Sequence, residues 1–280
     1  MQDYAPQIFS AYISSNSGIK KAIKRGRILT NGKPASTGTW ITEGALIELL
    51  NTEKSLPKIY QMQLDVIFED EHFAAINKPA GISVSGNNFR NIYNALPYNL
   101  KKSTAIDALS WPTPVHRLDN PTSGILLIAK TKTAQIELGN QFKNKTIQKK
   151  YCVIVTGNVT QNRIIDIPIE NKEAETAFDV IRVSKSVKYG YLTCLKAYPK
   201  TGRTHQIRIH LASIGHPILG DKLYWDNPNI KHSKGLFLSA TEVEFNHPKS
   251  YKKIHLKLDV PRKFKSFLVR EKRIWNTVNK

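Results

Sequence analysis

Residues 116–130 read HRLDNPTSGILLIAK and join a polar turn to an apolar run. Pro121 and Gly124 are typical of a turn, and residues 125–129 are short and apolar enough to form a buried strand. Asp119 stands just before the turn. A carboxylate in a loop that leads into a core strand is anchored on one side and accessible on the other. The stretch therefore presents Asp119 as an acid available for chemistry, although an Asp that caps a turn before Pro121 fits the residues equally well.

The charge of the whole chain favours a polyanionic partner. Its 280 residues hold 42 Lys and Arg against 22 Asp and Glu, a net charge of +20, which is the electrostatic pattern of nucleic-acid-binding proteins. The excess is concentrated in residues 17–34, which have no acid, and in residues 231–280. Each region is a candidate contact for a phosphate backbone. The alternative for both is a solvated basic surface.

Several other classes of protein are not supported by the sequence. The two cysteines, Cys152 and Cys194, each lie in an apolar strand-like run, without a CxxC pair or a Cys/His cluster that would suggest zinc. No apolar run approaches a membrane span, and the first residues lack the features of a signal peptide. We therefore expect a cytoplasmic protein without a membrane partner or a metal.

Residues 1–55 are predicted to form a small separate module. Ser17 is the predicted N-cap of a short basic helix over residues 19–25, and Gly26 is its predicted end. The pair Asn31-Gly32 between apolar runs predicts a hairpin, and residues 45–50 read as a further strand. Residues 51–60 read as a linker. The predicted domain boundary falls within it, and the second predicted domain spans residues 56–280.

The second domain alternates strands and helices without a repeating β-α-β period, which predicts an α+β fold with a mixed sheet. Residues 131–142 carry apolar side chains at helical spacing. Residues 151–155, 178–183 and 191–198 read as strands, the last two as a pair. Thr204 is the predicted cap of a helix that Gly215 ends, with Ile207 and Leu211 on one apolar face.

The stretch from His116 to Lys130 resembles the signature of the RluA-type pseudouridine synthases, and five further segments match this family in the same order. They are residues 64–84, the K-x-Y element at residues 149–151, TGRTHQIRIHL at 201–211, and two landmarks at 216–221 and 245–248. Together these matches cover about 225 residues. The resemblance implies a largely antiparallel mixed sheet, and an enzyme that isomerises uridine in structured RNA without a metal or an organic cofactor.

The resemblance also implies roles for individual residues. Asp119 matches the catalytic carboxylate, which acts either as a nucleophile on the ribose or as a base on it. Arg208 matches the arginine that pairs with this acid, with an ordinary surface ion pair as its alternative. Tyr151 matches the tyrosine that lies against the uracil, with a core aromatic as its alternative.

Two further arginines are expected to contact RNA. Arg117 matches the residue that enters the RNA stack when the target base is flipped out, although a phosphate contact suits it equally. Arg203 precedes the predicted helix and is expected to make a phosphate or structural contact. His205 and His210 fall on different faces of a helix or a strand, so a metal site there is not expected.

Residues 1–55 resemble the small RNA-binding module that also occurs in a small-subunit ribosomal protein. Its predicted RNA-binding residues are the basic side chains at the start of the module, Lys20, Lys21, Lys24, Arg25 and Arg27. One position departs from the family pattern, because Ser239 stands where a histidine is usual. This departure concerns packing or substrate detail.

The leading prediction is thus a monomeric RNA isomerase that modifies large-subunit ribosomal RNA, with transfer RNA as the second choice of substrate. The rival is a non-catalytic RNA-binding or assembly protein on the same fold, which would have little reason to retain Asp119, Tyr151 and Arg208 together. A methyltransferase is not supported, because no glycine-rich cofactor loop follows a strand.

Overall fold

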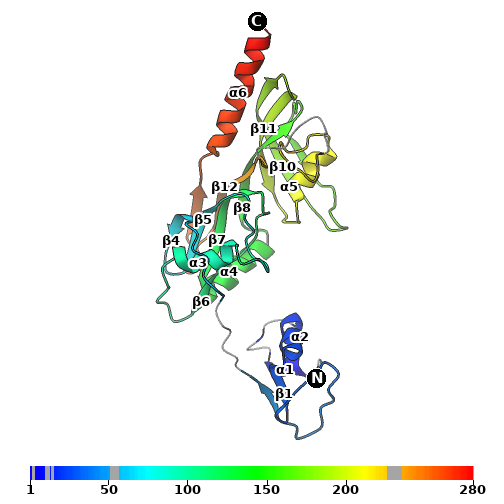
Figure 1. Ribbon diagram of the computed structural model, residues 1–280, viewed down its shortest axis with the longest axis vertical. Helices are drawn as coiled ribbons and strands as arrows, with labels where there is room; N and C mark the ends of the chain where they lie inside the picture. The colour runs from blue at the N-terminus through cyan, green and yellow to red at the C-terminus, as the bar shows by residue number, and fades with distance from the viewer. Residues whose placement is uncertain (2–3, 10–12, 14–15, 51–56, 226–234, 280) are drawn as a thin grey trace. The chain divides into compact units, whose positions relative to one another are not determined.

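The computed structural model describes residues 1–280 with the exception of 2–3, 10–12, 14–15, 51–56, 226–234 and 280. The chain divides into two compact units, Met1–Leu56 and Pro57–Lys280 (Figure 1). Part of the predicted linker, residues 51–56, lies outside the described residues. None of the helices in the described part of the chain is long and apolar enough to cross a membrane.

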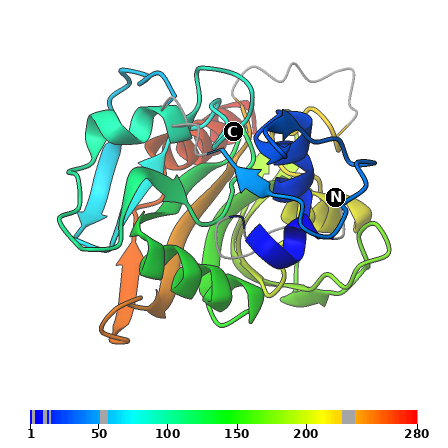
Figure 2. The same cartoon turned by 90° about the horizontal axis from the view of Figure 1, so that it is seen from below.

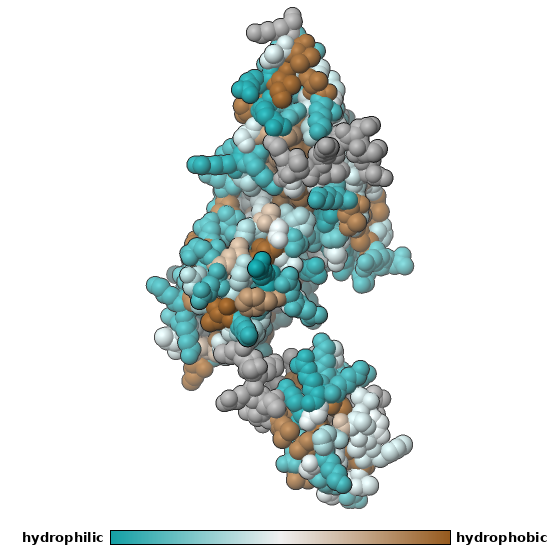
Figure 3. Space-filling view, viewed as in Figure 1, coloured by the Kyte–Doolittle hydropathy of each residue, from teal (hydrophilic) through white to brown (hydrophobic). Residues whose placement is uncertain are grey.

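The first unit packs two short helices on a small antiparallel sheet. The helices are α1 (Ala5–Phe9) and α2 (Asn16–Lys24), and the strands β1 (Ile28–Thr30), β2 (Lys33–Pro34) and β3 (Ile47–Leu49) lie in the order β2-β1-β3. Ile19 and Ile23 of α2 are buried against Ile28. The lysines of α2 lie on the opposite, exposed face, and Figure 3 shows hydrophilic side chains over this helix.

The predicted hairpin and the predicted end of the helix are confirmed in this unit. Asn31 and Gly32 both adopt positive φ (50° and 75°) between paired Thr30 and Lys33, as a tight hairpin turn requires. Gly26 follows the helix with φ 65°. The predicted cap is wrong, since α2 begins at Asn16 and Ser17 lies inside its first turn. The run Ser-Ser-Asn-Ser at residues 14–17 offers four good cap residues in succession, and propensity does not choose among them.

The second unit is built on one mixed sheet to which ten strands contribute among the described residues. Its path runs β4-β5-β7-β12-β8-β11-β10-β9, with β6 paired to β7 and β13 to β12. The strands are β4 (Asp65–Glu69), β5 (Phe73–Lys78), β6 (Ala108–Pro114), β7 (Ser123–Thr131), β8 (Gln148–Thr156), β9 (Arg163–Ile165), β10 (Thr176–Ser186), β11 (Gly190–Pro199), β12 (Leu238–Asn246) and β13 (Lys253–Lys257). Among these pairings only β7 with β12 is parallel, so the predicted α+β fold with a largely antiparallel sheet is confirmed.

Four helices of this unit are described: α3 (Ile92–Asn99), α4 (Lys132–Lys143), α5 (Gln206–Ser213) and α6 (Arg262–Val278). Alternate residues of β7 face opposite sides of the sheet, and both sides are covered. Leu126 and Ile128 pack in the cluster that contains α3, whereas Leu127 packs with Leu138 of α4. Figure 2 shows α3 and α4 on opposite faces of this half of the sheet. The strand after Asp119 is therefore buried on both faces, as its apolar run predicted.

The parallel contact between β7 and β12 depends on glycine. Gly124 pairs with Ala240 and has φ 114°, and a Cβ at this position would lie 2.1 Å from the Ala240 carbonyl oxygen. Beside it, the Ser123 hydroxyl donates to the hydroxyl of Ser239 at 3.1 Å. Ser239 is 3% exposed. The residue that departs from the family pattern therefore belongs to the seam between the two halves of the sheet.

The start of α5 differs from the prediction. The helix begins at Gln206, and the cap position is held by His205 in the left-handed region (φ 57°), so Thr204 is not the cap. No side chain caps the first turn, and the Gln206 side chain instead ties the helix to the preceding loop, because its Oε1 accepts hydrogen bonds from the Thr201 hydroxyl and from the Arg203 backbone N–H. The predicted end is confirmed, since Gly215 follows the helix with φ 79°.

Candidate active site

Asp119 lies in the loop between β6 and β7, and this loop is fixed to the turn after β5. The Gly81 N–H donates to the Asn120 carbonyl at 2.8 Å. The ammonium group of Lys78, a side chain with no exposed surface, donates to the same carbonyl at 3.2 Å and to the carbonyls of Pro79 and Ile82. Burial lowers the pKa of Lys78 to about 8, while nearby Asp119 acts in the opposite direction. A buried cation thus holds the backbone of the loop that carries the acid.

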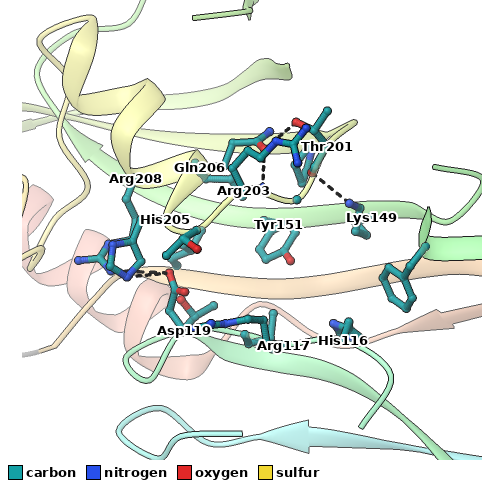
Figure 4. A pocket seen from close by; sticks show the side chains of 18 of the residues that line it. His116, Arg117, Asp119, Lys149, Tyr151, Thr201, Arg203, His205, Gln206 and Arg208 are labelled. Atoms are coloured by element: carbon teal, nitrogen blue, oxygen red, sulfur yellow. Dashed lines mark hydrogen bonds and ion pairs between the residues drawn. The ribbon is translucent and has the colours of Figure 1, made fainter. Parts of the chain in front are cut away.

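The Asp119 carboxylate opens into a cavity of about 300 Å³ that lies between the β6–β7 loop, β8 and the start of α5 (Figure 4). Its side chain is 16% exposed. The residues that line this cavity with it include Val115, His116, Arg117, Phe142, Lys149, Tyr151, Thr201, Arg203, His205, Gln206, Arg208 and Leu238. The cavity therefore collects most of the side chains that the sequence singles out in the second domain.

Arg208 joins two carboxylates. Its Nη1 lies 3.6 Å from Asp119 Oδ2, while its Nε and Nη2 make a bidentate pair with Asp221 at 2.7 and 2.8 Å. Arg208 is 5% exposed, so it is not an ordinary surface residue. Arg203 does not reach the acid, because its Nε donates to the Glu173 carbonyl at 2.9 Å. The structure thus brings Arg208 to Asp119 but gives the closest contacts of its guanidinium to Asp221.

Asp221 positions this arginine and was not among the predicted site residues. It is 1% exposed, and its Oδ1 also accepts the backbone N–H groups of Leu223 and Tyr224. Burial would raise its pKa, but the bonds from Arg208 and these amides hold the pKa below its usual value. The pair Gly220-Asp221 was visible in the sequence only as a landmark. A Cβ at Gly220 would lie 2.1 Å from the Gly235 carbonyl oxygen, so the glycine is a packing requirement.

His205 is a second group that sequence reasoning missed. Its left-handed backbone turns the ring toward the acid, with Nε2 3.8 Å from Asp119 Oδ2 and Nδ1 2.9 Å from the Tyr224 hydroxyl. Burial lowers its pKa, against the effect of Asp119. A non-glycine residue in this region of φ is uncommon and persists where its surroundings fix it. The Tyr224 hydroxyl and the start of α5 supply that restraint.

Tyr151 and His116 flank the remainder of the cavity. Tyr151 extends from β8 beside Asp119, and burial and that carboxylate both raise the pKa of the phenol, which therefore keeps its proton. The His116 Nε2 accepts the Leu127 N–H at 3.0 Å. Burial lowers the pKa of His116 to about 3, with nearby Lys149 acting in the same direction, so its ring is neutral. Arg117, next to it, is exposed at the cavity wall.

The predicted RNA-binding residues of the first unit belong to α2 and the turn after it. Lys20, Lys21, Lys24 and Arg25 are exposed. Arg27 differs from them, because its guanidinium donates to the Leu50 carbonyl at 3.3 and 3.2 Å and joins the ends of β1 and β3. In the described part of the chain no group of three or more His, Cys, Asp or Glu side chains is arranged to hold a metal ion. His210 points away from the cavity and bonds Thr176 and the Ile167 carbonyl.

Known proteins resemble this chain in both sequence and structure. Residues 72–213 match the model of the RNA pseudouridylate synthase family. A "Ribosomal large subunit pseudouridine synthase C" of Buchnera aphidicola is 34% identical over 90% of this chain and 88% of its own length. A "Ribosomal large subunit pseudouridine synthase D" of Zymomonas mobilis is 34% identical over 71% and 69%. The solved structure of human RNA Pseudouridylate Synthase Domain Containing 1 has the same fold, with a TM-score of 0.61 at 21% identity over 75% of this chain and 87% of that one.

Proposed function

The chain belongs to the RNA pseudouridylate synthase family, and from that membership we propose that it converts uridine to pseudouridine in large-subunit ribosomal RNA, with Asp119 as the reacting carboxylate. As a member of this family it is an isomerase of the RluA type that acts on RNA. The observation that carries the proposal for the site is the Asp119 carboxylate, which opens into a cavity while Arg208 lies 3.6 Å away. The ribosomal target is supported by the names of the two relatives.

In the proposed reaction, the bond between the ribose C1′ and the uracil N1 breaks, the base turns, and its C5 carbon joins C1′. C5 loses a proton and N1 gains one, so no oxidant or reductant is needed. Asp119 begins the reaction either by attacking C1′ or by taking the proton from C2′. Arg208, fixed by Asp221, orients the carboxylate for either role. The short hydrogen bonds of Arg208 go to Asp221, whereas its distance to Asp119 is longer. The Asp119 oxygens therefore remain available to the ribose.

Tyr151 and Arg117 receive roles from their positions on the cavity wall. The Tyr151 ring provides a surface on which the uracil stacks after the target nucleotide leaves the RNA helix. Arg117 is exposed beside it and contacts the RNA, either in the position that the base vacates or at a phosphate. Arg203, with one of its donors held by the Glu173 carbonyl, contributes a phosphate or structural contact.

We also assign the two domains different tasks. Residues 1–55 bind RNA through Lys20, Lys21, Lys24 and Arg25, and residues 56–280 carry out the isomerisation. The support is the distribution of charge, since these four side chains are exposed and form no ion pair with any described carboxylate. Cations of this kind attract a phosphate backbone irrespective of its sequence.

Mapping of pseudouridine in total RNA, from cells with and without the gene, tests the proposed function. We expect one or a few uridines of the large-subunit ribosomal RNA to remain unmodified without the gene. Wild-type enzyme restores them, whereas the Asp119→Asn variant does not. Sites that are lost only from transfer RNA would overturn the proposed target. An unchanged map would favour the non-catalytic RNA-binding protein.

A further inference from the structure

Lys149 differs from Lys78, Lys130 and Lys150 in what its ammonium group contacts. Lys78 donates to the carbonyls of Pro79, Ile82 and Asn120. Lys130 pairs with Glu69 at 2.7 Å, and Lys150 pairs with Glu242 at 2.6 Å. The Lys149 Nζ donates to the Thr201 carbonyl at 3.2 Å and forms no ion pair with a carboxylate that the structure describes. An ammonium group has three donors, so Lys149 keeps capacity for a further acceptor.

The surroundings of Lys149 do not neutralise its charge. The ring of His116 across the cavity is neutral and accepts its bond from Leu127. Burial lowers the pKa of Lys149 to about 8, the direction expected when an ammonium group loses water without gaining a counter-ion. The unpaired cation therefore makes this part of the cavity suited to a partner with negative charge.

The strand geometry directs Lys149 and Tyr151 into the same cavity. Side chains alternate along β8, and residues 149 and 151 both line the cavity while Lys150 pairs with Glu242 of β12. Figure 4 shows Tyr151 between Asp119 and Lys149. A nucleotide whose ribose meets Asp119 and whose base lies against Tyr151 extends its base toward Lys149.

The proposed reaction creates negative charge on that base. When the C1′–N1 bond breaks, its electron pair remains on the uracil and is shared by N1 and the carbonyl oxygens O2 and O4. This holds whether Asp119 attacks C1′ or removes the C2′ proton. The charge disappears when C5 bonds to C1′ and the C5 proton is exchanged for a proton on N1. A fixed cation beside the carbonyl oxygens stabilises the separated base more than the bound uridine.

We propose that Lys149 is a catalytic residue that donates a hydrogen bond to a carbonyl oxygen of the uracil and stabilises the anion formed when the glycosidic bond breaks. This assignment rests on the proposed function of Asp119. A phosphate contact is the competing role for a lysine in an RNA enzyme. The enclosed position of Lys149 on the Tyr151 side of β8 favours the base, whereas exposed Arg117 at the cavity wall suits the backbone.

The test separates the chemical step from RNA binding. The substrate is an unmodified transcript of the ribosomal RNA segment that contains the mapped uridine. Single-turnover rates at saturating enzyme and dissociation constants are measured for wild type, Lys149→Met, Lys149→Arg and Lys150→Met. Lys150→Met is the matched control, because it removes the neighbouring ammonium group that pairs with Glu242. Lys149→Gln is a second uncharged variant whose amide can still donate to the Thr201 carbonyl.

We expect Lys149→Met and Lys149→Gln to lower the saturated rate by about 10²- to 10³-fold, the usual effect of removing one donor to a developing anion. Lys149→Arg keeps the charge and should retain much more activity than either, and Lys150→Met should be close to wild type. A saturated rate of folded Lys149→Met or Lys149→Gln within tenfold of wild type overturns the proposal. In that case a large loss of affinity would assign Lys149 to the RNA backbone.

A fluorinated substrate adds a readout that a structural role would not change. Fluorine at C5 withdraws electrons and stabilises the uracil anion, so the loss caused by Lys149→Met should be smaller for cleavage of 5-fluorouridine in the same RNA. Nuclease digestion and mass spectrometry measure how fast that nucleoside is consumed. An equal loss on both substrates counts against the anion. If wild type forms no pseudouridine, the proposed function fails as well, whereas an active wild type with an equally active Lys149→Met removes only this inference.

Discussion

The two units of the protein use positive charge in opposite ways. In the first unit, the α2 lysines are exposed and form no ion pair with a described carboxylate. In the second unit, Arg208 is 5% exposed and Lys78 is fully buried. These two cations have their hydrogen bonds assigned to Asp221 and to backbone carbonyls.

This difference teaches what each kind of cation can do. An exposed cation attracts a polyanion over a distance, with an energy that salt weakens. A buried cation must be satisfied by the protein, and a satisfied cation fixes the geometry around it. We therefore expect substitutions at the cavity to affect the rate of reaction, and substitutions on α2 to affect RNA affinity.

The sharpest test of the comparison is Asp119→Asn. The substitution keeps the shape of the side chain and removes the charge and basicity that the reaction uses. We expect single-turnover pseudouridine formation to fall by roughly 10⁴-fold or more, with RNA affinity largely retained. Asp166→Asn, at an exposed aspartate, serves as the control. Measurable turnover by Asp119→Asn on the correct RNA would remove the acid from its assigned role.

The second test compares a buried arginine, Arg208, with Arg203 in the same segment of the chain. Arg208→Ala should lower the rate by about 10²- to 10³-fold because the carboxylate loses its orienting charge, whereas Arg203→Ala should change it only a few-fold. Arg208→Ala also leaves Asp221 buried and unpaired, a loss of about 3 to 5 kcal/mol in stability. Rates are therefore compared below the measured melting temperature of each variant. A larger loss of rate in Arg203→Ala would reverse the assignment.

The role of the exposed α2 lysines in RNA binding is tested by a triple substitution in the full chain, Lys20→Gln, Lys21→Gln and Lys24→Gln. Each lost phosphate contact should reduce the salt slope of RNA affinity by about 0.7 to 0.9, without a change in the saturated single-turnover rate. The matched control replaces Lys101, Lys102 and Lys132, three exposed lysines of the second unit, by Gln. An unchanged slope would mean that α2 faces solvent in the complex.

The smallest predicted effect is the acid sensitivity of the second unit. His116 has a pKa of about 3 in the folded protein and an ordinary value near 6.5 when unfolded. Between these values the unfolded chain binds the extra proton, so stability falls as the pH is lowered. The loss from pH 6 to 5 should be about 1 kcal/mol for this residue. Denaturant unfolding of wild type and His116→Gln measures it, and an equal pH slope in both would contradict the assignment.

Local sequence patterns predicted the elements that are held together by local physics. The Asn31-Gly32 hairpin, the helix after Thr131 and the paired strands β10 and β11 were all confirmed. Each depends on the periodicity of apolar side chains or on turn residues a few positions apart. The family resemblance added the pairing of Asp119 with Arg208, which lie 89 positions apart in the numbering and in no common local pattern.

The remaining parts of the site depend on contacts that a linear pattern does not contain. Lys78 meets the Asn120 carbonyl across 42 positions, and only the packing of the β5 turn against the Asp119 loop brings them together. The left-handed conformation of His205 accompanies the contact of its ring with the Tyr224 hydroxyl, 19 positions further along the chain. Asp221 was recognised only as a family landmark, because it lies outside the helices and strands and meets Arg208 of α5 across 13 positions.

The parallel seam between β7 and β12 has a consequence for biosynthesis. Ser123 and Ser239 bond across 116 positions. Among the described strands, β12 lies between β7, which follows the Asp119 loop, and β8, which carries Tyr151, and so joins the two halves of the sheet. A ribosome makes both halves well before it makes β12, and such distant pairing is slow to form. A chain truncated before Leu238 should therefore bind no uridine productively. We therefore expect the nascent enzyme to gain activity only after β12 has been synthesised.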